Sequence, residues 1–412
     1  MSDFHAARLS AEQPVVPAPG VEAEMDVRGL CVFGISRTAV EQGTASQVPP
    51  FLEARGWEIL HVEDLSAGGT ATNGIHPELW VRGEPTCADS QIAMLVAALS
   101  LNPSPPSAHQ RAKYPNLDNG RIMAMLQPRF SDLHAQRQAV DPRLAATANA
   151  DDAVTYLQLL MPGPMDDLRA RIVALRNAFR TPQPVLRDLS RRANRAKVEL
   201  VEHEGQLAVR KTFRSSQSRF LEREVAGRSE LRGIESIPEL LGHGDNWILT
   251  PFYDDTLRFQ RNPNRLLPLS VAKASVRTAQ ELYRAGYFLL DFQPSNILVD
   301  RHHGLKVIDL EFLHRYEAVP DSFEQDFTLN GLPAEFTGDL PLGKCRTYAT
   351  HWQPYVGLSL HSLLNDPVPV QHLKRLRYRL KRLTERIRRK AARGVGTISL
   401  TSPRPIDPDS LG

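Results

Sequence analysis

Cysteine is scarce in this 412-residue chain, which contains only Cys31, Cys87 and Cys345. Three such scattered thiols exclude a disulfide framework and a zinc-finger type of site, so a reducing compartment is expected. Long apolar runs are also lacking, because no stretch approaches the ~20 residues that cross a bilayer. The first twenty residues lack the basic start and the apolar core of a secretory signal peptide. We therefore expect a cytoplasmic protein.

The composition is that of a globular protein, with 42% hydrophobic and 24% charged residues. This length and balance predict two or three domains. Proline-rich residues 1–24 and the final residues 394–412 are expected to be flexible tails. Between them, the sequence predicts a separate N-terminal α/β domain over 25–129, to which no activity is assigned, and a helical connection over 130–185.

The N-terminal domain is predicted from its apolar patterns. Leu30–Ile35 and Trp57–Val62 have the character of strands, and a short helical stretch lies between them. This order suggests a βαβ unit. Ser90–Ser100 carries apolar residues at helical spacing, so a further helix is expected there.

The stretch Gly286–Phe312, GYFLLDFQPSNILVDRHHGLKVIDLEF, carries the most chemical information. Asp291 precedes Asn296 by five residues in a loop. A short apolar strand, a turn at Gly304 and a return strand then deliver Asp309, so the two ends of this hairpin lie side by side. In that arrangement the oxygens of Asn296 and Asp309 can bind Mg²⁺ that bridges ATP phosphates. Asp291 can accept or orient the proton of an attacking hydroxyl group.

The sequence DFQPSN followed by IDLE resembles the catalytic and metal loops of the kinase-like phosphotransferases that act on aminoglycosides, choline and related small molecules. In protein kinases the second motif is usually Asp-Phe-Gly, whereas Glu311 follows here, and no Ala-Pro-Glu signal closes an activation segment. The resemblance covers roughly 187–366 and implies a bilobal, protein-kinase-like domain over 186–366. The family usually carries His at position 289, where this chain has Leu289. Turn chemistry alone would also supply Asp, Pro, Ser and Asn, but it does not explain the paired metal motif.

Two strands upstream are predicted to form a hairpin, Lys197–Glu202 and Leu207–Phe213. Alternate side chains of a strand point to opposite faces, so Lys211 and Arg210 must face different ways. Strand parity favours Lys211 as the residue that holds the α and β phosphates of ATP. The family pattern of alanine, any residue and a cation would also admit Arg210.

The segment that follows this hairpin resembles the helix whose glutamate pairs with the strand lysine. Glu224 is the expected partner of Lys211, and Glu222 is its competitor, interpreted as a surface residue of the helix. Phe252 and Tyr253 would then offer backbone groups to adenine, although core packing alone could produce the same apolar pattern.

One part of a protein kinase is missing from the sequence. The stretch DLSRRANRAKVELVE, before the first hairpin turn, contains no glycine, so it cannot form a Gly-rich loop over the ATP phosphates. Small-molecule kinases often lack that loop as well. The expected function is ATP- and Mg²⁺-dependent phosphoryl transfer to a hydroxyl of a small molecule, a sugar or a cell-envelope glycan. The alternative is a catalytically inactive kinase-like scaffold that binds nucleotide.

The C-terminal region is strongly basic. Residues 371–393 contain eleven Lys or Arg against one Glu, a local charge of +10, while the formal total is only +3. A basic amphipathic helix is predicted over 367–393, with an apolar seam at alternating spacings of three and four. The seam consists of Leu373, Leu376, Leu380, Leu383 and Ile387.

Three interpretations of this helix compete. The seam could dock on the acidic remainder of its own chain, which is the common structural case and is favoured. It could also lie on an anionic membrane at the inner face of the cell, since lipid attracts each cation by about 1 kcal/mol. Nucleic acid is the weakest interpretation, because Tyr378 is the only accompanying aromatic residue. Self-pairing is disfavoured, because flanking arginines would face like charges.

Overall fold

The computed structural model describes residues 26–65, 80–82, 92–126, 144–160, 165–190, 195–256, 266–341 and 347–395. The chain forms two compact units. Of the described residues, the first unit contains those up to 49, those from 59 to 126 and those from 144 to 176, and the second contains 50–58 and those from 177 onward. The fold is mixed α and β. The expected tails lie outside the described residues, except that the last helix extends to Val395.

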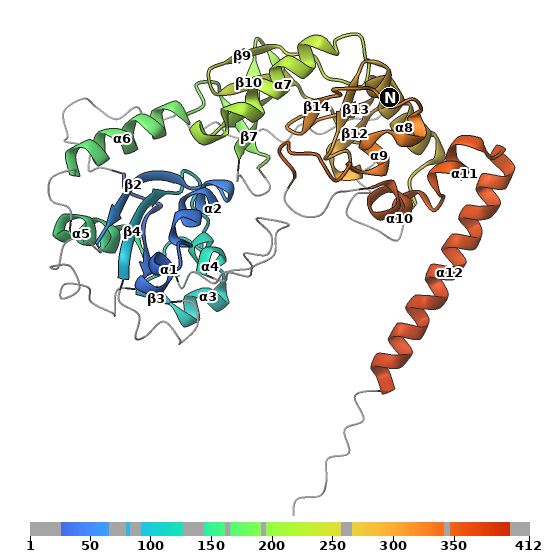
Figure 1. Cartoon of the computed structure of the whole chain (residues 1–412). Coiled ribbons are helices and arrows are strands. Elements are labelled where there is room, and N and C mark those ends of the chain that lie inside the picture. Colours follow the sequence, from blue (N-terminus) through green and yellow to red (C-terminus); the bar gives the residue numbers. More distant parts are fainter. Residues whose placement is uncertain are drawn as a thin grey trace, which may run out of the picture. The chain divides into compact units, whose positions relative to one another are not determined.

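The first unit is built on a five-stranded sheet with the order β2-β4-β1-β5-β3 (Figure 1). Its central strand β1 is buried over its whole length and runs antiparallel to β4 on one side and β5 on the other. The strands are β1 (Leu30–Ser36), β2 (Glu58–Asp64), β3 (Trp80–Arg82), β4 (Ile92–Leu99) and β5 (Leu144–Thr147). Short helices accompany them, namely α1 (Arg37–Glu41), α3 (Ala108–Lys113) and α4 (Arg121–Leu126), whereas most of α2 (Val48–Ala54) belongs to the second unit.

The helix predicted over Ser90–Ser100 is wrong, because the structure forms strand β4 there. The run IAMLVAAL is apolar throughout, and most of β4 is buried between two neighbouring strands. A continuous apolar run of this length fits a buried strand and a buried helix equally well by periodicity. Because β4 lies between β1 and β2, the two strands of the predicted βαβ unit are not neighbours in the sheet.

The structure also moves the boundary of the first unit beyond residue 129. The sequence predicts a helical connection over 130–185, and this segment does contain α5 (Ala150–Leu160) and α6 (Met165–Ala178). However, β5 pairs with β1, and both helices contribute to the same core as the sheet. The four residues LAAT of β5 carry no alternating pattern, so only their partner strand identifies them as a strand.

The second unit begins with an antiparallel sheet of the order β6-β7-β8-β10-β9. The predicted hairpin is formed by β7 and β8, and its turn uses Glu204 and Gly205, both with positive φ. Such a turn matches the right-handed twist of the paired strands. The strands are β6 (Val185–Asp188), β7 (Ala196–His203), β8 (Gln206–Phe213), β9 (Gly242–Gly244) and β10 (Trp247–Pro251). Helix α7 (Ser218–Glu230) packs Phe220 and Leu221 into one core with Ile248 of β10.

A mainly helical region follows. Helix α8 (Leu269–Arg284) packs its apolar face into the largest core of this unit. Two antiparallel strand pairs follow α8. One is the hairpin of β12 (Ile297–Asp300) with β13 (Gly304–Val307), and the other joins β11 (Tyr287–Leu289) to β14 (Leu313–Arg315). Next come α9 (Phe327–Asn330), a π-helical turn (Tyr348–Trp352), α10 (Gln353–Val356), α11 (Leu360–Asn365) and α12 (Val368–Val395).

Helix α12 contains the predicted basic segment, but its apolar seam is exposed. The five seam side chains are 49–59% exposed, and a different face of the helix packs on the second unit. The second unit therefore leaves the seam uncovered, whereas the seam was expected to dock on its own chain. Among the described helices, none has both the length and the apolar character needed to cross a bilayer.

Gly227 allows α7 to lie close to β14. A Cβ atom at this position would stand 2.4 Å from Cδ2 of Leu313, which is itself buried. Glu224 lies one turn earlier on the same helix, so this close approach also sets the position of its carboxylate.

We predict that Gly227→Val lowers the free energy of unfolding by about 2 kcal/mol, because the added methyl groups overpack this contact. Ala226→Val is the matched control, since Ala226 is exposed on the same helix and the change should cost only about 0.5 kcal/mol of helix propensity. Urea unfolding of both variants measures the difference. Equal losses would show that α7 does not need this close approach.

Candidate active site

An ion pair joins the sheet of the second unit to helix α7. The ammonium group of Lys211 on β8 lies 2.7 Å from Oε1 of Glu224 on α7. Arg210 lies on the opposite face of the strand, where its guanidinium stacks over the ring of Trp247 at 4.1 Å. Glu224 is completely buried, whereas Glu222 is exposed. The structure therefore brings Lys211 and Glu224 together and leaves their competitors elsewhere.

The second oxygen of Glu224 is held by an arginine of the same helix. Arg228 donates to Oε2 of Glu224 from Nε at 3.1 Å and from Nη2 at 2.7 Å. It also donates to the backbone carbonyls of Pro238 at 3.0 Å and Ile308 at 3.2 Å. Both carboxylate oxygens of Glu224 are thus engaged, and α7 is bonded to the residue that precedes Asp309.

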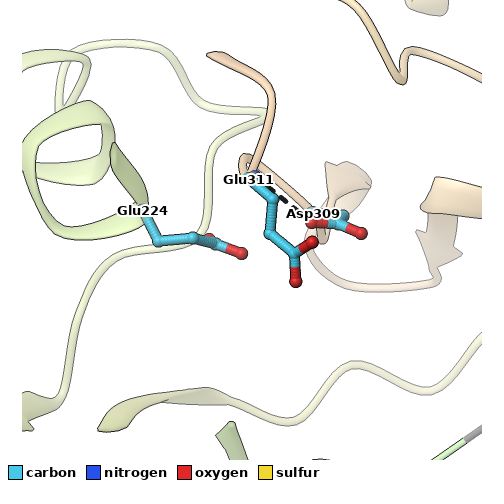
Figure 2. Close-up of side chains that lie close together, drawn as sticks. All are labelled: Glu224, Asp309 and Glu311. Atoms are coloured by element: carbon cyan, nitrogen blue, oxygen red, sulfur yellow. Dashed lines mark hydrogen bonds between the residues drawn. The ribbon is translucent and has the colours of Figure 1, made fainter. Parts of the chain in front are cut away.

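Two further carboxylates approach the same ammonium group. Lys211 Nζ lies 3.2 Å from Oδ1 of Asp309 and 2.7 Å from Oε1 of Glu311. The guanidinium of Arg195 is hydrogen-bonded to the other oxygen of Glu311. Figure 2 shows Glu224 approaching from α7, with Asp309 and Glu311 on the loop that follows β13. The backbone N–H of Glu311 donates to Oδ1 of Asp309 at 3.3 Å, which fixes the two residues relative to each other.

These contacts keep the cluster ionised although it is largely buried. Burial alone would favour the neutral amine, but the three surrounding carboxylates outweigh it and raise the pKa of Lys211. Burial likewise opposes ionisation of Asp309, but Lys211 and Arg195 together lower the pKa of this carboxyl group. The cluster is formally neutral, because three carboxylates meet three cations, namely Glu224, Asp309, Glu311, Lys211, Arg195 and Arg228.

The three carboxylates alone do not make a metal centre. Oxygens of Glu224, Asp309 and Glu311 lie within 4.8 Å of one another, a separation that one cation could bridge. The Lys211 ammonium already makes that bridge, because it contacts an oxygen of each carboxylate. We conclude that Lys211 is the counter-ion of this group.

A second set of polar contacts surrounds Asp291. The side-chain nitrogen of Asn296 donates to the backbone carbonyl of Asp291 at 3.0 Å and to its Oδ2 at 2.9 Å. Nε2 of Gln293 donates to Oδ1 of Asp291 at 3.1 Å. The amide nitrogen of Asn296 is used in this way, and its amide oxygen, an acceptor, is the atom of this side chain that could bind a cation. Asp291 and Asn296 are both buried, with 7% and 9% exposure.

The β12–β13 hairpin brings Asn296 and Asp309 to the same end. Its register pairs Ile297 with Val307, and the N–H of Ile308 donates to the carbonyl of Asn296 at 3.0 Å. Asp309 therefore follows directly after a residue bonded to Asn296. An amide oxygen and a carboxylate are hard oxygen donors of the kind that Mg²⁺ prefers, so these two residues fit the metal that the sequence motif implies.

Phe252 and Tyr253, the two residues predicted to contact adenine, lie in different surroundings. The N–H of Phe252 donates to the carbonyl of Leu207 at 3.2 Å, which continues the β8–β10 pairing by one residue. This N–H is therefore used by the sheet, and Phe252 can offer adenine only its carbonyl. Tyr253 is buried, and its ring contacts His303 and Lys306 of the β12–β13 hairpin.

Position 289 has a structural explanation. Leu289 is completely buried in the core that contains α8, and its backbone N–H donates to Thr328 at 3.2 Å. The loop that follows is fixed independently, because the indole nitrogen of Trp352 donates to the carbonyl of Phe292 at 2.8 Å. An apolar side chain at 289 thus still supports the loop that carries Asp291.

Three residues of the site were missed by sequence reasoning, namely Glu311, Arg195 and Arg228. Glu311 was visible as the last residue of IDLE, but neither Arg195, which pairs with Glu311, nor Arg228, which pairs with Glu224, was expected at the site. Arg195 lies in the glycine-free stretch before β7, but it pairs with Glu311, 116 residues away, and lies 4.9 Å from the ring of Phe312. The neighbouring Arg191 and Arg192 lie outside the described residues. Such long-range pairs leave no local pattern.

Comparison of the chain with protein-family models and with curated proteins finds no match. The resemblance to kinase-like phosphotransferases therefore rests on the sequence motifs.

We predict that Glu224→Gln lowers the free energy of unfolding by about 3 kcal/mol, because it leaves two buried cations short of a carboxylate. Glu222→Gln is the matched control on the exposed side of α7, and it should change stability by no more than about 0.5 kcal/mol. Denaturant unfolding followed by far-UV circular dichroism measures both. A similar, small effect of the two substitutions would mean that the buried pair does not stabilise this unit.

Proposed function

We propose that the second unit is a kinase-like phosphotransferase that moves a phosphoryl group from ATP, with Mg²⁺, to a hydroxyl of a small molecule, a sugar or a cell-envelope glycan. We place this activity in the cytoplasm, where ATP is supplied. The observation that carries the proposal is the Lys211 ammonium, which contacts both Glu224 of α7 and Asp309 of the loop after β13. Phosphate binding and metal binding need these groups at one place.

The order of elements supports a bilobal arrangement of the kinase-like type. A five-stranded antiparallel sheet with one helix, α7, precedes a mainly helical region. The Asp291 loop and the β12–β13 hairpin lie within that second region, directly after α8. Between Leu313 and Asn365, the described residues form β14 and short helices, which supports the small-molecule branch rather than a long peptide-binding segment.

Each residue has a separate task in this proposal. When bound, ATP supplies the phosphoryl group, and Mg²⁺ neutralises charge on its phosphates. Asn296 and Asp309 hold the metal through side-chain oxygens, and Lys211, positioned by Glu224, holds phosphate oxygens. Asp291 orients the acceptor hydroxyl and takes its proton, because Gln293 and Asn296 fix its carboxylate from two sides.

Lys211 must exchange a carboxylate for phosphate when nucleotide binds. Glu311 is the partner best suited to release it, because its second oxygen keeps the guanidinium of Arg195. Glu224 is the least suited, since it is fully buried and also holds Arg228. Arg195 thereby makes the exchange less costly, because Glu311 is never left unpaired.

A second candidate function is a nucleotide-binding scaffold without catalysis. The observation that favours it is the contact of Glu311 with Lys211, because this carboxylate offsets the positive charge that Lys211 could direct at reacting phosphates. The two functions differ in turnover. Nucleotide protection in a melting experiment, followed by an ADP-release screen against candidate acceptors, separates them, since acceptor-dependent release of ADP excludes the scaffold.

We predict that Asp291→Asn lowers kcat by about 10²-fold or more with an acceptor found in that screen, because the amide cannot take the proton. Binding of Mg-ATP should persist. Asp321→Asn, an exposed aspartate of the same unit, is the control and should retain full turnover. Unchanged kcat in the Asp291 variant would remove this carboxylate from the reaction.

We predict that Asp309→Asn abolishes the metal-dependent part of nucleotide binding. In the wild type, Mg-ATP at 100 times its Kd should add about 2.7 kcal/mol to the unfolding free energy. The variant should lose the difference between Mg-ATP and ATP with chelator, as measured by the shift in melting temperature. Normal protection of the variant by Mg-ATP would place the metal elsewhere.

A further inference from the structure

Helix α12 is attached to the second unit through polar side chains. Gln371 and Arg375 are buried on the attached face, with 1% and 8% exposure. Both side chains donate hydrogen bonds to backbone carbonyls. Arg382, further along the same helix, also donates to a backbone carbonyl. The carbonyls are those of Ser362, Leu363 and Asp366 for Gln371, Val356 and Leu267 for Arg375, and Pro354 for Arg382.

The apolar seam lies on the opposite face. At roughly 100° per residue, the seam is centred about 140° around the helix from the attached face. Its side chains remain about half exposed, at 49% for Leu373, 53% for Leu376, 54% for Leu380 and Leu383, and 59% for Ile387. The seam is about 20 Å long at 1.5 Å per residue. An amphipathic helix of a globular protein normally buries its apolar face, so this orientation is reversed.

Exposed cations lie on both sides of the seam. Arg377, Lys381 and Arg388 follow one side, and Arg379 lies on the other. Their long side chains can reach along the helix surface while their charged ends stay in water. The seam is therefore an apolar stripe between two basic edges. The helix that carries it extends away from the rest of the second unit (Figure 1).

The apolar stripe and the cations beside it together indicate what kind of partner can bind this face of α12. A second copy of the helix would cover the leucines, but it would bring arginines against arginines. Nucleic acid would neutralise the cations, but it would leave the leucines in water. An anionic bilayer surface satisfies both, because leucines enter the boundary between headgroups and acyl chains while cations meet the headgroups.

We propose that α12 binds the protein to the anionic, cytoplasmic face of a membrane, with Leu373, Leu376, Leu380, Leu383 and Ile387 in the bilayer interface. The polar attachment of Gln371, Arg375 and Arg382 presents the seam to the lipid without any rearrangement of the helix. This inference is independent of phosphoryl transfer, since no residue of the candidate active site takes part in it.

Co-sedimentation of the full chain with lipid vesicles tests the proposal. The protein should pellet with vesicles made of equal amounts of phosphatidylcholine and phosphatidylglycerol, and stay in solution with phosphatidylcholine alone. Raising the salt concentration should weaken binding, because it screens the attraction between exposed charges. Failure to pellet with the anionic vesicles overturns the proposal.

Two variants separate the seam from the charge. Leu376→Gln, Leu380→Gln and Leu383→Gln together should lower vesicle partitioning at least about 100-fold, because three leucines no longer gain from burial. Arg377→Gln with Lys381→Gln should lower it about 25-fold, or about five-fold for each cation. All five side chains are exposed, so the fold should be retained, which circular dichroism verifies.

The matched control is Arg277→Gln with Arg284→Gln. These two exposed arginines lie on α8, so this variant has the same loss of charge away from the seam and should pellet like the wild type. If this control variant binds the vesicles as weakly as the α12 charge variant, the attraction reflects the overall charge of the protein and the proposal fails. Sedimentation equilibrium without lipid is the last arm. A wild-type dimer that the leucine variant converts to monomer would assign the seam to self-association instead.

Discussion

The second unit depends on one buried ammonium group. Lys211 reaches three carboxylates that come from a helix and from a loop almost one hundred residues further along the chain. An ammonium in the protein interior is costly unless it is paired and hydrogen-bonded. Strand β8, helix α7 and the loop after β13 must therefore meet at this point for any of these charges to be buried. The same requirement that organises the fold also assembles the candidate site.

Local sequence patterns were sufficient to place side chains whose position depends on the alternation of a strand or on a short motif. Strand parity separated Lys211 from Arg210, since the two must face opposite sides of β8. The turn at Gly304 and the apolar runs around it indicated the β12–β13 hairpin, and with it the approach of Asp309 to Asn296. These features involve few residues, and their geometry follows from the backbone alone.

Local sequence patterns failed where contacts with distant parts of the chain determine the structure of a segment. The run that forms β4 is apolar at nearly every position, and only its two strand neighbours make it a strand. The pairing of Arg195 with Glu311 has no local signal, because the partners are far apart in sequence. The seam of α12 was expected to face its own chain, since apolar faces usually do. Hydrogen bonds from Gln371 and Arg375 to carbonyl groups fix the opposite orientation, and no periodicity reveals such bonds.

Arg228 has a consequence for regulation. Its guanidinium binds Glu224 on one side and the carbonyl of Ile308 on the other, so α7 cannot swing outward without pulling on the backbone next to Asp309. Enzymes that are switched off by rotating a helix need that helix to move independently of the metal-binding strand. Here the two are tied together by a buried residue. For the proposed phosphotransferase, an inactive state reached by displacement of α7 is thus disfavoured.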